Sequence, residues 1–262
     1  GIDASVCNEE ASSFLQTCQA LDCIYLDPAR RDSKGRKMIS IADCTPNLLE
    51  IKDLLLSKCD SAWIKYSPML DMSVAMNELK SVDQIHVVSV NNECKELLFH
   101  LTKQYGASPT ITCVNLKRNN EQEIFSYLWE DENTSVFHPA SQIETYLYEP
   151  NASILKAGAF KIICQRFNVK KLSLNSHLYT SDTYIDDFPG RKFKVEASLS
   201  MNKQQIKEHL QDCHQANITT RNFPLSVEQL RSKLKITDGG DVYLFATIFQ
   251  DQKILLKTFA IR

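Results

Sequence analysis

Short, strongly apolar runs alternate with amphipathic segments over residues 1–130, and this alternation restricts the fold more than any other feature. The apolar runs are hydrophobic on both faces of an extended chain, so strands formed by them must be covered on both sides. Strands that alternate with helices form a mainly parallel sheet with helices on its faces. We therefore predict an α/β unit with strands at Cys23–Leu26, Ala62–Tyr66, Ile85–Val90 and Thr110–Leu116.

The segments between these strands carry helical signals. A helix is predicted from Thr45 or Asn47 to about Ser57, because Thr45 and Asn47 are both suitable N-cap residues. A second helix is predicted over Asn92–Tyr105, where leucines recur at helical spacing and Gly106 follows as a stop signal. Both helices would cover the faces of the predicted sheet.

The end of this region has a different pattern. Phe125–Glu130 alternates after a polar loop, and we predict that it forms an antiparallel hairpin with the last of the four strands. Residues 131–142 then form a polar stretch that we take as a domain boundary. Beyond it, a helix is predicted over Asn151–Phe167, with Asn151 as its N-cap.

The C-terminal region has the pattern of a small α+β domain. From Phe193 onward, the apolar residues alternate between the spacings typical of strands and of helices. Two glycines between Asp238 and Asp241 form a strong turn signal before the last hairpin. The predicted order is strand, helix, strand, helix, strand and strand (193–199, 202–210, 216–220, 226–234, 242–249 and 253–260).

Glycine and cysteine usage restrict the function and the compartment. The chain has only seven glycines, and none of them is arranged as a phosphate-binding loop or a dinucleotide fingerprint. Its nine cysteines are an odd number scattered through apolar or helical runs, which indicates free thiols and a cytoplasmic protein. No apolar run approaches the length of a membrane helix. His209, Cys213 and His214 lack a second pair at zinc spacing, so no metal site is predicted.

Charge is distributed unevenly along the chain. The net charge is −2, but residues 190–262 carry 12 basic against 7 acidic residues, and residues 1–189 carry 18 against 25. A basic end on an acidic body is compatible with a nucleic-acid-binding appendage, although ordinary surface lysines would give the same balance. In this basic end we predict RNA contacts at Lys194, Arg221 and Asn222.

Arg221 has an alternative role. It could pair with an internal acid such as Asp238 or Asp241 and thereby stabilise the domain rather than bind RNA.

A run of polar residues follows the first predicted strand. Asp27 and Pro28 end this strand at the carboxyl edge of the sheet, where open α/β sheets bind ligands. Because Pro28 has no N–H and a fixed φ, the carbonyls beside it are free to accept hydrogen bonds. Such a turn can hold the exocyclic amine of a base. The alternative is a strand-ending Asp-Pro turn stabilised by local hydrogen bonds.

Polar residues and a proline also end the second predicted strand. If the two strands are neighbours, Lys65 and Ser67 lie at the same edge as Asp27. Lys65 could equally be an ordinary surface lysine at a strand end.

Several segments resemble the bacterial class I S-adenosylmethionine-dependent methyltransferases that carry a THUMP-like domain. These segments are 26–32 with 43–47, 64–71 and 88–98, while 149–160 resembles the family's ferredoxin-like domain and 221–224 with 238–241 its THUMP-like module. The resemblance implies an α/β fold with a truncated Rossmann-like sheet over residues 1–142. It also implies a ferredoxin-like domain over 143–190 and a THUMP-like domain over 191–262.

The resemblance implies methylation of a base nitrogen in a structured RNA, with tRNA as the expected class. Asp27 would orient the target amine, and the backbone of Pro28 and Ala29 would accept a hydrogen bond from it. Arg30 or Arg31 would neutralise a neighbouring phosphate. Lys65 and Ser67 would also contact the substrate.

The resemblance also locates part of the cofactor site. Residues 6–11 resemble a contact near the adenine of S-adenosylmethionine, which assigns Glu10 and Ala11 to cofactor binding, with Glu10 where the family usually has an aspartate. The family's glycine-rich loop and ribose-binding acid have no match in these residues. We therefore expect a C-terminal part of a longer protein, with weak cofactor binding and no methyl transfer on its own.

Two further expectations concern self-association and the function class. The first strands would leave an exposed sheet edge, which favours self-association or a covering partner. The alternative to an enzyme is a non-catalytic RNA-binding or assembly module that keeps the methyltransferase fold.

Overall fold

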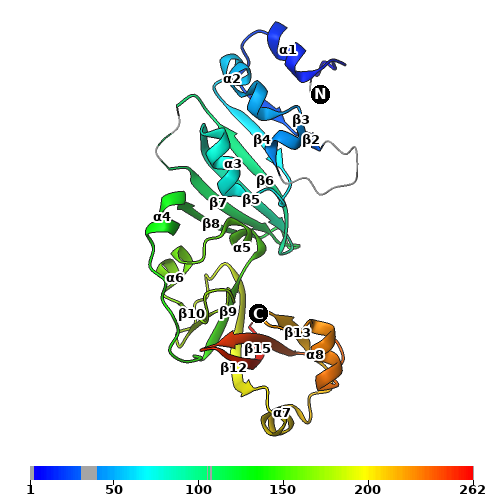
Figure 1. Ribbon diagram of the computed structural model, residues 1–262, viewed down its shortest axis with the longest axis vertical. Coiled ribbons are helices and arrows are strands. Elements are labelled where there is room, and N and C mark those ends of the chain that lie inside the picture. Colours follow the sequence, from blue (N-terminus) through cyan, green and yellow to red (C-terminus); the bar gives the residue numbers. More distant parts are fainter. Residues whose placement is uncertain (1–2, 31–39, 105, 107, 262) are drawn as a thin grey trace. The chain divides into compact units, whose positions relative to one another are not determined.

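The structure is a computed structural model that describes all residues except 1–2, 31–39, 105, 107 and 262 (Figure 1). It divides into two compact units, Gly1–Glu130 and Asp131–Arg262. The boundaries at residues 142 and 190 stay predictions. Within the described part of the chain, none of the helices has the length and apolar character needed to cross a membrane.

The first unit is built on a six-stranded mixed sheet. Its end strand β1 is parallel to β4, and β5 is parallel to β7. Strand β6 lies between β4 and β5 and is antiparallel to both, while β7 and β8 form an antiparallel hairpin. The four predicted strands and the predicted hairpin are confirmed, but the prediction of a mainly parallel sheet is wrong, because two of the five neighbouring strand pairs are parallel and three are antiparallel. The spatial order is β1 (Ile24–Leu26), β4 (Ala62–Tyr66), β6 (Glu93–Leu101), β5 (Val82–Val90), β7 (Thr110–Leu116) and β8 (Gln122–Leu128).

The predicted helix over Asn92–Tyr105 is wrong, because this segment forms β6. Leu97, Phe99 and Leu101 are fully buried while the residues between them are half-exposed, which is the two-residue period of a strand. Asn91 and Asn92 both have positive φ and join β5 to β6. Two such residues form the tight hairpin turn between these strands.

Helices and several short elements complete this unit. The predicted helix after Thr45 is confirmed as α2 (Leu48–Lys58), and the side chain of Asn47 accepts from the N–H of Leu49 at 3.1 Å. Helix α3 (Met72–Leu79) was not predicted, although Asp71 caps it by accepting from two backbone N–H groups. The remaining elements are α1 (Ala11–Thr17), β2 (Ala29–Arg30), the 3₁₀ helix η1 (Ile41–Asp43) and β3 (Cys44–Thr45).

The second unit is built on a seven-stranded sheet. Its neighbouring strands are antiparallel except β13 and β14, which are parallel. The long strand β12 pairs with β9 on one side and with β15 on the other. The spatial order is β10 (Lys170–Lys171), β11 (Tyr179–Ser181), β9 (Tyr146–Pro150), β12 (Gly190–Ser200), β15 (Gln252–Ala260), β14 (Val242–Phe249) and β13 (Asn217–Thr220).

The helices of the second unit partly match the prediction. The single helix predicted over Asn151–Phe167 is two short helices, because Gly158 adopts a left-handed conformation at φ 74° and ends the first of them. The order predicted from Phe193 onward is confirmed, whereas β9 and β11 were not predicted. The helices are α4 (Trp129–Thr134), α5 (Ala152–Ala157), α6 (Ile162–Phe167), α7 (Lys203–Leu210) and α8 (Val227–Leu234).

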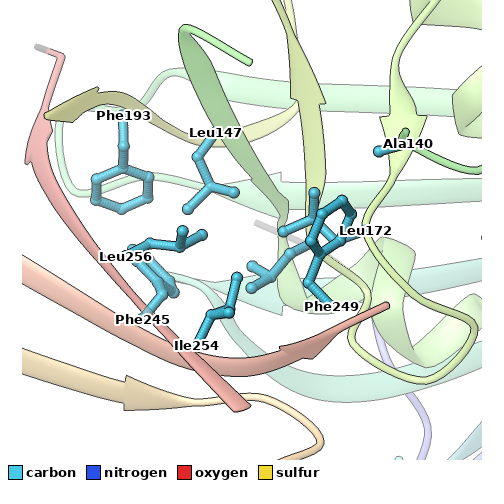
Figure 2. Close-up of a cluster of buried hydrophobic side chains, with 9 residues drawn as sticks. Ala140, Leu147, Leu172, Phe193, Phe245, Phe249, Ile254 and Leu256 are labelled. Carbon is cyan, nitrogen blue, oxygen red and sulfur yellow. The ribbon is translucent and has the colours of Figure 1, made fainter. Parts of the chain in front are cut away.

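One hydrophobic cluster contains side chains from β9, which precedes residue 190, and from β12, β14 and β15, which follow it (Figure 2). Leu147 of β9 belongs to the same cluster as Phe245 of β14 and Leu256 of β15, and all three side chains are fully buried. The rings of Phe193 and Phe245 meet edge to face with centroids 4.8 Å apart. The segment before residue 190 and the segment after it therefore share one core.

Candidate functional site at the carboxyl ends of β1 and β4

The carboxyl ends of β1 and β4 bring Asp27 and Lys65 together. Leu26 pairs with Ile64 in the parallel register, so the next residue of each strand lies beside the other. The Lys65 ammonium forms an ion pair with Oδ2 of Asp27. The expectation that both strand ends share one sheet edge is confirmed.

A pocket of about 290 Å³ opens at this edge. Asp27 keeps half of its side-chain surface exposed, whereas Pro28 is buried in the wall. The lining residues come from the turn after β1, from β3 and the residue before η1, from β4 and the turn after it, and from β6. They are Asp27, Pro28, Ser40, Cys44, Lys65, Tyr66, Ser67, Pro68, Leu70, Lys95 and Glu96.

The Asp27–Lys65 pair leaves the carboxylate available to a ligand. The hydrogen bond to Asp27 raises the pKa of Lys65 above its usual value, so the lysine carries its positive charge at neutral pH. The two side chains are 51% and 31% exposed, and ion pairs in such positions contribute only about 0–1 kcal/mol. A ligand that offers its own N–H donor can therefore displace the lysine at low cost.

Seven lining residues were not identified as site residues in the sequence: Ser40, Cys44, Tyr66, Pro68, Leu70, Lys95 and Glu96. Lys95 and Glu96 lie on β6, which the sequence assigned to a helix, and Cys44 is the first residue of β3. Tyr66 is the last residue of β4, and its buried hydroxyl finds no hydrogen-bond partner among the described residues. Burial raises the pKa of Tyr66, so its hydroxyl stays protonated.

The residues next to Asp27 and Lys65 stabilise the backbone around the pocket. Ser67 Oγ accepts from the N–H of Met69 at 3.2 Å and thereby orders the turn after β4. In the pairing of β2 with β3, Ala29 lies opposite Thr45 and Arg30 lies opposite Cys44. The predicted phosphate contact Arg31 lies outside the described residues.

A second pocket of about 380 Å³ lies against β1. Leu26, which lines it, directly precedes Asp27. Ala11 also lines this pocket, whereas Glu10 stands at the N-cap position of α1 and is exposed. Its lining residues are Ser5, Cys7, Glu9, Ala11, Phe14, Leu15, Leu21, Cys23, Ile24, Tyr25, Leu26 and Leu55.

Strand β1 is the end strand of its sheet, and its Tyr25 side chain is 60% exposed. An uncovered strand edge is a template for pairing with another chain. We expect light scattering of the purified chain to show dimers or larger species. A monodisperse monomer would contradict this prediction.

The predicted RNA-contacting residues belong to the second unit. Arg221 forms an ion pair with the carboxylate of Glu149 at 2.5 Å, and Arg191 Nε donates to the same carboxylate at 2.7 Å. Glu149 is 2% exposed, so it holds two guanidinium groups from inside the fold. Arg221 therefore pairs with an internal acid, which is Glu149. It does not pair with Asp238, which pairs with Arg231.

The other two predicted contacts are exposed. Lys194 lies on β12 opposite Tyr146 on one side and Phe259 on the other. Asn222 adopts a positive φ of 50° in the turn after Arg221.

The start of α8 after this turn is capped by its own side chains. The Ser226 side chain accepts from the N–H of Gln229 in a capping box, and Glu228 adds a negative charge to the first turn. A substitution of Lys194 therefore tests phosphate binding more directly than a substitution at the start of α8.

Two family models match segments of the second unit. Residues 146–189 match the family model of a ferredoxin-like domain, and residues 190–258 match that of a THUMP domain-like family. No protein of the curated set matches the chain.

One solved structure is similar to nearly the whole chain. It is described as a putative methyltransferase from Porphyromonas gingivalis W83, with 37% sequence identity and a TM-score of 0.84. The match covers 92% of this chain and 60% of the Porphyromonas chain, so the chain spans about three fifths of that protein. The resemblance to methyltransferases with ferredoxin-like and THUMP-like domains is confirmed, as is the α/β class with a Rossmann-like sheet.

Proposed function

We propose that this chain, with its Rossmann-like, ferredoxin-like and THUMP-like parts, holds the acceptor side of an RNA methyltransferase site. The substrate would be a base nitrogen in a structured RNA, with tRNA as the expected class. The observation that carries this proposal is the exposed Asp27–Lys65 pair at the mouth of a pocket between two parallel strand ends. The nine cysteines are free thiols, which supports a cytoplasmic protein.

Asp27 would act on the acceptor amine. An exocyclic N–H of the base would replace the Lys65 ammonium as the donor to the Asp27 carboxylate. By accepting this hydrogen bond, the carboxylate orients the lone pair of the nitrogen and stabilises the positive charge that develops on the nitrogen during methyl transfer. Pro28 supplies no N–H, so the backbone beside Asp27 offers acceptors to the same amine.

S-adenosylmethionine would supply the electrophilic methyl group, and the residues present fit this cofactor in part. The pocket beside β1 has apolar walls from Phe14, Leu15 and Leu26, which suit the faces of an adenine ring. Ala11 lines this pocket and Glu10 stands next to it in the sequence, so we assign both to cofactor binding. A glycine-rich loop for the methionine part has no counterpart in these 262 residues.

We expect residues 1–262 alone to bind S-adenosylmethionine weakly or not at all, because only the adenine side of the site is represented. Isothermal titration calorimetry of this chain and of the full-length protein checks the prediction. Micromolar binding by the chain alone would contradict it. The same experiment tests the alternative of a non-catalytic RNA-binding module, for which neither protein should bind the cofactor.

The THUMP-like match and the basic balance of residues 190–262 support RNA as the partner. We expect Lys194→Gln to weaken binding of a structured RNA by about 3–10-fold and to lower the slope of log affinity against log salt by about one. Filter binding over a range of salt concentrations measures both quantities.

Arg221→Gln separates the two roles of Arg221. Loss of affinity together with a flatter salt slope would assign Arg221 to RNA. A lower melting temperature with an unchanged slope would assign it to the internal pair with Glu149. An unchanged affinity and slope in Lys194→Gln would remove β12 from the proposed RNA surface.

A further inference from the structure

A hydrogen-bonded chain of Ser61, His100 and Asp83 lies at the amino end of β4, at the opposite end of this strand from Lys65. His100 Nε2 is 2.8 Å from Ser61 Oγ, and His100 Nδ1 is 2.6 Å from Asp83 Oδ1. Both distances are those of a nucleophile, a base and the acid that orients the base. The proposed methyl-transfer site uses none of these residues.

The sheet register brings the three side chains together. His100 lies on β6 between two partner strands, opposite Trp63 of β4 and Gln84 of β5. Ser61 precedes β4, two residues before Trp63. The register of β5 shifts between Val82 and Gln84, so Asp83 is the extra residue of a bulge. Bulges re-aim side chains, and this one places the Asp83 carboxylate on the imidazole.

The hydrogen bonds assign the tautomer of the neutral imidazole. An Asp83 carboxylate can only accept, so His100 Nδ1 carries the proton in the neutral ring and Nε2 is the acceptor. The Ser61 hydroxyl then donates to Nε2. The Trp63 ring lies 4.5 Å from the imidazole between centroids and restricts its orientation. The His100 imidazole can therefore accept the proton of the Ser61 hydroxyl, and a neighbouring base of this kind activates a serine as a nucleophile.

The surroundings of Ser61 are compatible with an incoming acyl donor. Ser61 is only half-buried, so a small ester can reach its oxygen. Cys23 Sγ lies 3.8 Å from Ser61 Oγ and is a second nucleophile that an experiment must distinguish.

We propose that Ser61 is an activated nucleophile that accepts the acyl group of small activated carboxylic esters. Ser61 Oγ forms a bond to the carbonyl carbon as its proton passes to His100 Nε2. The ester C–O bond then breaks, and His100 returns the proton to the leaving oxygen. Water, deprotonated by His100, releases the acyl group as a carboxylic acid and restores the Ser61 hydroxyl. Asp83 orients the imidazole throughout.

The test uses p-nitrophenyl acetate and this chain as it is. We expect a stoichiometric burst of p-nitrophenolate, with the acetyl group located on Ser61 by peptide mass spectrometry. Ser57 is the matched control, because its hydroxyl donates to a backbone carbonyl at 2.6 Å instead of to an imidazole, and it should stay unmodified. Cys23→Ala should retain the burst.

Variants of the chain separate activation from a structural role. Ser61→Ala should abolish the burst, and His100→Gln should slow it by about 100-fold, the size of a lost general base. Asp83→Asn should also slow it, because the orienting acceptor is lost.

The comparison of Ser61 with Ser57 is made within the folded wild-type chain, so it does not depend on the stability of any variant. Acetylation of neither serine, or of both at equal rates, would overturn the proposal. An unchanged burst in a folded His100→Gln would do the same. The three residues would then be a hydrogen-bonded link between strands.

Discussion

Replacing Asp27 by alanine should lower the rate of methyl transfer by the full-length protein about 1,000-fold while changing the affinity for S-adenosylmethionine only a few-fold. The carboxylate is proposed to hold the acceptor amine, so its loss affects the transition state more than cofactor binding. Its exposure at the pocket mouth and its replaceable Lys65 partner make this role possible. Single-turnover methylation assays and calorimetry measure the two quantities.

Lys65→Gln is the matched control for Asp27→Ala. It removes the internal competitor for the carboxylate and keeps Asp27 in place. We expect the maximal rate to stay within a few-fold of wild type and the RNA KM to change little or fall. If instead Asp27 only ends a strand and pairs with Lys65, both variants should reduce stability slightly and leave turnover near wild type.

Gly190→Ala should lower the free energy of unfolding of the second unit by about 4 kcal/mol. A Cβ at this position would lie 2.2 Å from the carbonyl oxygen of Glu149 and 2.9 Å from the backbone of Pro150 and Asn151. These backbone atoms belong to the paired strand β9 and the residue after it, which cannot move without breaking the β9–β12 register. Urea unfolding followed by circular dichroism measures the change.

Gly239→Ala separates steric clash from backbone strain. Gly239 also has a positive φ, 106°, but a Cβ added there would meet no atom within 4 Å. This substitution therefore adds only the conformational cost of about 1 kcal/mol. Equal losses in the two variants would show that the contact with Glu149 is unimportant.

The Gly190 contact lies where the two family matches meet. Residues 146–189 match one family and residues 190–258 the other, yet β9 and β12 belong to one sheet. Glu149 pairs with Arg191 and Arg221 across the same point. We therefore expect the two matched segments of the Gly190→Ala variant to unfold together, in a single transition of the urea unfolding curve.

Local signals in the sequence were enough for much of the fold. The apolar runs at Ala62–Tyr66 and Thr110–Leu116 became strands, and Asn47 and Asn151 became helix caps. Each of these signals acts within a few residues, through hydrophobic periodicity or a side chain bonded to a nearby N–H. The placement of Asp27 at the carboxyl edge of the sheet also followed from local order, since it directly follows an apolar strand.

The tertiary structure alone decided the features that depend on distant residues. Leucines over Asn92–Tyr105 fit a helix or a strand, and pairing with both β4 and β5 selected the strand. That choice put Lys95 and Glu96 into the pocket and His100 between Ser61 and Asp83. Strand pairing between residues far apart in sequence sets such contacts, so no short stretch of sequence contains the information.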